Sequence, residues 1–257
     1  MKNIQEAEGI ILFTRHYREK DKLVKIFTES YGKKMFFVKN ANRKNSDILS
    51  AIQPFTCATY IMDLRAEGLS FLNSSKDVSS FKTMQTDITV SAYGTYLCNL
   101  ADVAIEDNVY DPALYGFLKK SLELLDEHYD PEIITNIFEV QLLNRFGIKI
   151  DWSKCAICGE QQGKFDYSSE YQGIICDKHF QPDVKRFNLD AKAIHFLRLF
   201  SHIQLSQINQ INLKQETKDS IRFALDILYD EYVGVHLKSK KFIDNMKSWE
   251  KMLKKED

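Results

Sequence analysis

The pattern of apolar and polar positions in the first 80 residues predicts short β-strands. Apolar and β-branched residues cluster or alternate in five segments, at 8–17, 22–32, 33–40, 52–62 and 68–75. Tyr31-Gly32 is a plausible turn, and the polar stretch NANRKNSD at 40–47 shows no periodicity and is expected to be a loop. Five closely spaced strands predict a small barrel over residues 1–80. An oligonucleotide-binding (OB) type and an SH3-like barrel both satisfy this pattern.

From about residue 85 the apolar positions follow a helical repeat instead. Helices are predicted at 88–105, 112–129, 131–147, 190–203 and 216–237. Pro112 suits a first helical turn, and Gly147 suits a left-handed cap at a helix end. The basic tail 238–257 is expected to fray. The predicted fold is therefore α+β and multidomain, with a helical domain at 81–257 that is interrupted at about 150–185.

Charge is distributed unevenly along the 257 residues. The net charge is −1, but residues 1–50 hold eleven Lys and Arg against six acids, which is +5, so the remainder carries about −6. A basic end suggests contact with a polyanion, and a merely solvated charged surface is the alternative. The N-terminus has no apolar signal region, and no apolar run is long enough to cross a bilayer. The sequence predicts a cytoplasmic protein without a membrane partner.

Three of the five cysteines lie in the segment that interrupts the helices. They form the pairs Cys155-x-x-Cys158 and Cys176-x-x-His179, with seventeen residues between the pairs. This spacing is typical of zinc ribbons and knuckles, because two ligands on one tight turn suit tetrahedral Zn²⁺. Three thiolates and one imidazole fill all four positions, so a structural ion is predicted, with ordinary thiols as the alternative.

The sequence lacks several common motifs of enzymes. The chain has no P-loop, no G-x-G-x-x-G fingerprint and no G-x-S-x-G elbow. The zinc deaminases place a His-x-Glu before their Cys-x-x-Cys, and that pair is missing here. A metal-dependent hydrolase or deaminase is thus the weaker hypothesis, and the chain is expected not to be an enzyme.

Cations and aromatic residues are interleaved near the predicted third strand. Tyr31, Phe36 and Phe37 lie among five cations, which are Lys33, Lys34, Lys39, Arg43 and Lys44. Cations neutralise phosphates and aromatic faces stack on unpaired bases, a combination typical of single-strand binders. Phe36 and Phe37 are adjacent, so one of them must face the core. A protein-interaction adaptor, with the basic end simply solvated, is the competing hypothesis.

Several stretches of the sequence resemble one known family. They are GIILFTRHYREKDKLVKIFTESYGKKMFFVKNANR at 9–43, IQPFT at 52–56 and FEVQLLNRFGIKIDWSKCAICG at 138–159, followed by QGIICDKH at 172–179. In this order they are similar to the RecO family of bacterial recombination mediators.

The resemblance implies an N-terminal OB barrel, a helical domain and a zinc-finger insert. It implies binding of single- and double-stranded DNA, strand annealing, and partnership with RecR and with the C-terminal tail of single-strand-binding protein (SSB) in loading recombinase. By position, Arg15, Lys33, Lys39 and Arg43 match basic barrel residues of the family. Cys155, Cys158 and Cys176 match its zinc cysteines, and His179 replaces the fourth cysteine that the family commonly has.

Overall fold

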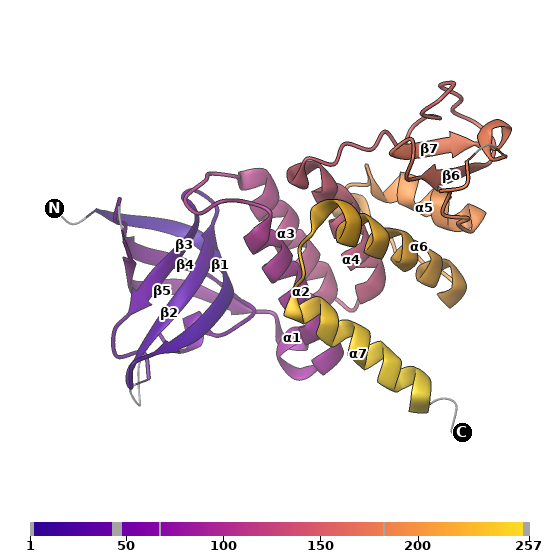
Figure 1. The fold of residues 1–257 in the computed structure, drawn as a ribbon. Helices are drawn as coiled ribbons and strands as arrows, with labels where there is room; N and C mark the ends of the chain where they lie inside the picture. The colour runs from indigo at the N-terminus through magenta and orange to yellow at the C-terminus, as the bar shows by residue number, and fades with distance from the viewer. Residues whose placement is uncertain (1–2, 43–47, 67, 182, 254–257) are drawn as a thin grey trace. The chain divides into compact units, whose positions relative to one another are not determined.

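The computed structural model describes residues 3–42, 48–66, 68–181 and 183–253 (Figure 1). The chain divides into two compact units, one formed by residues 1–128 together with 237–257 and the other by residues 129–236. The predicted boundary at residue 80 is therefore the end of the barrel, and the first helices belong to the same unit as the barrel. Among the described helices, none combines the length and hydropathy needed to cross a bilayer.

The first unit begins with a closed five-stranded barrel. Its strands are β1 (Ile4–Tyr17), β2 (Asp21–Thr28), β3 (Gly32–Val38), β4 (Thr56–Asp63) and β5 (Ser70–Ser80). They are joined in the order β1-β2-β3-β5-β4, with β1 also paired to β4. All pairs are antiparallel except β3 and β5. This order, with one parallel pair, selects the OB type over the SH3-like alternative.

Alternation along the strands separates the barrel interior from its outer face. Val24 and Ile26 of β2 and Phe36 of β3 point inward and are fully buried, together with Tyr60 and Met62 of β4. Phe37, the next residue, is half-buried on the outer face. The expectation that one of the two adjacent phenylalanines faces the core is confirmed.

Four helices complete the first unit. They are α1 (Lys82–Thr86), α2 (Ile88–Val103), α3 (Pro112–Asp126) and α7 (Lys238–Leu253). Asp87 and Asp111 accept hydrogen bonds from the first amides of α2 and α3, and Pro112 lies in the first turn as predicted. The prediction of a frayed tail is wrong: α7 is a regular helix that packs on α2, and its Ile243 is buried. The sequence analysis also missed the short helix α1.

The second unit consists of helices and a two-stranded sheet. Its elements are α4 (Pro131–Leu142), β6 (Phe165–Ser168), β7 (Gly173–Cys176), α5 (Ala191–Phe200) and α6 (Gln215–Leu228). Gly147 is left-handed and caps the short 3-10 turn after α4, as predicted. Gln141 of α4 donates to the carbonyls of Phe200 and Ile203 at 2.8 Å, and this contact joins α4 to the end of α5.

An ionic cluster with two buried lysines fastens the outer face of the barrel to the end of α2 and the loop after it. Lys33 on β3 is 6% exposed, and its Nζ donates to the backbone carbonyl of Asp102 and to its Oδ1 at 2.8 Å. Lys25 on β2, equally buried, donates to Asp107 Oδ2 at 2.6 Å. Gly32 allows the loop after α2 to approach closely, because an added Cβ would lie 2.2 Å from the carbonyl oxygen of Val109.

We predict that Lys33→Ala destabilises the first unit by about 2 kcal/mol or more, because the substitution removes the close partner of Asp102 and leaves Lys25 as the one cation for two carboxylates. Lys39→Ala, at an exposed position, should change the free energy of unfolding by less than about 0.5 kcal/mol. Urea unfolding followed by circular dichroism provides the comparison. Equal stability of the two variants would show that the cluster adds nothing to the fold.

The same cluster predicts a dependence of stability on pH. Burial opposes ionisation of Asp107, but hydrogen bonds and attraction from Lys25 and Lys33 outweigh burial and lower its pKa. A lowered pKa stabilises the fold above the ordinary value of about 3.9, and this contribution disappears as the pH falls through the folded value. Asp107→Asn should therefore be less stable than the unsubstituted chain at pH 7, with the difference shrinking below about pH 4. A difference that stays constant down to pH 3 would contradict the assignment.

Candidate functional sites on the barrel and in the insert

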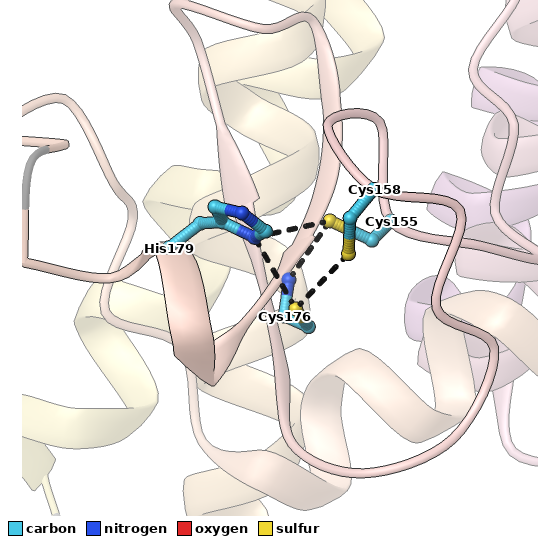
Figure 2. Close-up of side chains that lie close together, drawn as sticks. All are labelled: Cys155, Cys158, Cys176 and His179. Atoms are coloured by element: carbon cyan, nitrogen blue, oxygen red, sulfur yellow. Dashed lines mark hydrogen bonds between the residues drawn. The ribbon is translucent and has the colours of Figure 1, made fainter.

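The four predicted metal ligands come together in the second unit (Figure 2). Cys155 and Cys158 lie on a turn before β6, Cys176 is the last residue of β7, and His179 ends the 3-10 turn Asp177–His179. Their ligand atoms all lie within 4.8 Å of one another, and among the described residues this is the one group of its kind. Residues that are up to 24 positions apart thus form a single cluster.

Backbone hydrogen bonds bring the four ligand residues of the cluster together. The amide of Gly159 donates to the Cys155 carbonyl at 2.9 Å, and the amide of Cys155 donates to the Glu160 carbonyl at 2.7 Å. Gly159 has the left-handed backbone (φ +75°) that this tight turn requires. The amide of Cys176 donates to the Cys155 Sγ at 3.3 Å. These bonds hold the first pair of ligands against the second pair.

The distances between ligand atoms match a tetrahedral zinc site. Cys158 Sγ lies 3.7 Å from Cys176 Sγ, and His179 Nδ1 lies 3.7 Å from Cys155 Sγ and 3.3 Å from Cys176 Sγ. Zn–S bonds of about 2.3 Å and Zn–N bonds of about 2.0 Å give tetrahedral edges of roughly 3.8 Å between two sulfurs and roughly 3.5 Å between sulfur and nitrogen. Because all four corners are protein atoms, the group can hold a metal ion but offers no open position for a substrate.

Electrostatics at the cluster favours ionisation of one thiol. Burial opposes ionisation of Cys155, but amide donors from Cys158, Cys176 and Ile157 outweigh burial and lower its pKa to about 6. In contrast, burial raises the pKa of Cys176 to about 11, with the neighbouring sulfurs adding to the effect. A divalent cation at the centre would stabilise all three thiolates, because metal binding displaces their protons.

Buried aromatic side chains of β6 pack next to the segment that carries the cluster. Phe165 and Tyr167 of β6 are buried, and the Tyr167 ring packs against Phe187 with centroids 4.7 Å apart. Arg198 of α5 lies 4.6 Å from the Phe165 ring and donates to the carbonyls of Ser153 and Gln161 at 2.8 and 3.2 Å. The Arg198 guanidinium therefore ties the insert to α5.

The four described residues of the six predicted DNA-binding residues lie in different environments. Arg15 on β1 and Lys39 after β3 are exposed, whereas Lys34 is half-buried and its Nζ donates to Asn108 Oδ1. Lys33 is 6% exposed, and its Nζ is paired with Asp102 and Asp107 in the ionic cluster. Arg43 and Lys44 lie outside the described residues. The predicted continuous positive face of Lys33, Lys39 and Arg43 is thus not what the described residues form.

An exposed strip on the outer face of the barrel lies beyond the ionic cluster. Three rings from three strands meet there, namely Tyr17 on β1, Phe37 on β3 and Phe71 on β5, with successive centroids 6.0 and 5.8 Å apart. The guanidinium groups of Arg18 and Arg65 lie 5.2 and 5.3 Å from the outer two rings. We call these five residues the aromatic strip. Sequence reasoning found only Phe37, because the other members are distant along the chain.

The comparisons with known proteins agree with this architecture. The family model described as "Recombination protein O N terminal" matches residues 1–81, and the one described as "Recombination protein O C terminal" matches residues 85–241. The first model ends with the barrel, and the second includes the cysteine cluster. Together they span most of the chain.

Curated relatives match the chain over almost its whole length. A protein from Enterococcus faecalis named DNA repair protein RecO is 61% identical over 249 residues, which are 97% of this chain and 95% of the relative. Proteins of the same name from Lactococcus lactis subsp. cremoris and Streptococcus suis are 48% and 46% identical. Each alignment covers 97% of this chain, with 98% and 95% of the respective relative. The chain therefore belongs to the RecO family of DNA repair proteins.

Proposed function

We propose that this protein binds single- and double-stranded DNA, anneals complementary strands without hydrolysing a nucleotide, and helps to load recombinase onto gaps coated with SSB. The observation that carries the proposal is the exposed cationic and aromatic end of an OB barrel, the part of the outer face beyond the Lys25–Lys33 cluster. Membership of a DNA repair family supports it.

Phosphates are bound by the exposed cations in this proposal. Arg15 and Lys39 are free of the ionic cluster that holds Lys25 and Lys33. Lys34 contributes by exchanging its hydrogen bond with Asn108 for a phosphate. Arg43 and Lys44 remain predicted contacts, whereas Lys33 is removed from the set. Neutralising two strands on one protein lowers their mutual repulsion, and base pairing supplies the free energy of annealing. No catalytic residue is needed.

The resemblance to the RecO family also suggests protein partners for this chain. We propose that RecR and the acidic C-terminal tail of SSB bind this chain, and that it acts in the cytoplasm at the nucleoid. An adaptor that binds only proteins is the alternative, and it predicts complexes that survive nuclease without any direct shift of DNA.

The cysteine cluster is proposed to hold a structural Zn²⁺ ion. The support is the closed ligand set, its tetrahedral edges and the burial of Cys155 and Cys176. When bound, the ion would join two segments whose own apolar core is small, so that its binding energy becomes folding energy. The residues Cys155, Cys158, Cys176 and His179 would then be needed for folding of the insert and not for DNA chemistry.

We predict a steep salt dependence of DNA binding, with a log–log slope near −0.7 for each phosphate neutralised on a single strand. Arg15→Ala and Lys39→Ala should each make the slope shallower by about 0.7 and should slow annealing of complementary oligonucleotides. Lys82→Ala, an exposed lysine on α1, is the matched control and should change neither. Absent or salt-insensitive binding by the unsubstituted chain would overturn the proposed function.

For the metal, we expect one zinc ion per chain by elemental analysis. Cys158→Ser and His179→Ala should each reduce the zinc content and lower stability by about 3 kcal/mol, or about 6–12 °C in melting temperature. Cys98→Ala, in the buried α2, should keep the zinc. Full zinc content in His179→Ala would remove His179 from the ligand set. Loss of DNA binding in Cys158→Ser without loss of stability would refute a purely structural ion.

A further inference from the structure

The aromatic strip on the barrel's outer face is open to solvent in part, since Phe71 is 38% exposed and Tyr17 and Phe37 are half-buried. On β1, β2, β3 and β5, the paired positions Arg15, Leu23, Phe37 and Phe71 form one lateral row. Two residues further along β2, Lys25 is buried against Asp107. The helical part of the first unit thus covers one end of this face, and the strip begins where that cover stops.

The strip differs from an ordinary apolar patch because it includes two positively charged guanidinium groups. Arg18 and Arg65 flank the strip at its two ends, and each guanidinium lies over the ring beside it. Arg65 also pairs with Asp63 at 3.0 Å, a residue that is buried. Arg18 is exposed, and its left-handed backbone (φ 57°) lies in the turn between β1 and β2. Aromatic rings between guanidinium groups suit a ligand with π faces and negative charge.

The angles between the rings distinguish between two forms of nucleic acid. Tyr17 and Phe37 are inclined at 89°, and Phe37 and Phe71 at 82°. Bases in a stacked strand are parallel and repeat about every 3.4 Å. Rings that are about 6 Å apart and nearly perpendicular can be matched only by bases that are unstacked and turned relative to one another. A duplex holds its bases parallel and paired, so it has no free base face to offer.

We propose that the aromatic strip is a stacking site for two unpaired bases, which makes the barrel prefer single strands over duplexes. This inference rests on the proposed function, because it assumes that DNA meets this end of the barrel. Tyr17 and the exposed Phe71 contact the bases, while Phe37 between them holds both rings in position. Arg18 and Arg65 contact the flanking phosphates. The exposed cations outside the strip, which include Lys39, serve single strands and duplexes alike.

The test compares single-strand and duplex affinities of Tyr17→Leu and Phe71→Leu at one salt concentration, together with the salt slope. Each variant should lose about 5- to 150-fold in single-strand affinity, because stacking contributes about 1–3 kcal/mol per base. Duplex affinity and the salt slope should not change. Tyr110→Leu, at an exposed aromatic in the loop after α2, is the matched control and should bind like the unsubstituted chain.

A second measurement does not depend on a loss of binding. Phe71→Trp retains an aromatic face, so it should keep single-strand affinity, and its added fluorescence should be quenched by a single strand but not by a duplex. Unchanged affinity in both leucine variants, or an equal loss for single strands and duplexes, overturns the stacking site while DNA binding itself stands. Absence of any salt-dependent binding by the unsubstituted chain overturns the proposed function instead.

Discussion

The pairing of the buried Lys25 and Lys33 with Asp102 and Asp107 determines which surface of the barrel is free. An unpaired ammonium group on the outer face of a barrel stays in water, and it becomes buried only where carboxylates cover it. Here the end of α2 and the loop after it provide those carboxylates. The covered part of the face therefore serves to attach the helices and is not open to a ligand. The part that remains open carries the aromatic strip, Arg15 and Lys39.

This constraint explains which parts of the barrel site could be predicted. The sequence places Lys33, Lys34 and Lys39 close together, and proximity along the chain suggested a single basic patch. Alternation and the approach of α2 give the three residues different environments: buried, half-buried and exposed. The carboxylates that cover Lys33 lie about seventy positions further along, so no local pattern could reveal them. Tyr17 and Phe71 escaped notice for the same reason, since β1–β2–β3 pairing brings Tyr17 to Phe37 and β3–β5 pairing brings Phe71 to it only in the folded barrel.

The metal cluster was predictable because the spacing of its ligands is visible in short segments of the sequence. Two ligands separated by two residues on a tight turn are already oriented toward one ion, and the second pair has the same spacing. The regular helices were predictable too, since Asp111, Pro112 and Gly147 mark their ends with residues of known conformational preference. The tail was not, because α7 carries many charges, only Ile243 is buried among its described side chains, and the helix packs on α2, which lies far away in sequence. Tertiary packing, which no single segment encodes, makes it a helix.

A short stacking site suits a protein that must release the strands it joins. Stacking on a side chain contributes about 1–3 kcal/mol per base, and each step of a new duplex returns about 1.4 kcal/mol. A strip that held many bases would therefore compete with pairing along its whole length. If only two rings hold the strand, a few base-pair steps suffice to displace it, while the exposed cations keep both strands near the barrel. The ionic cluster limits the length of the strip, because it covers the remainder of the same face. The ionic cluster would then both attach the helices to the barrel and keep the binding of DNA short-lived.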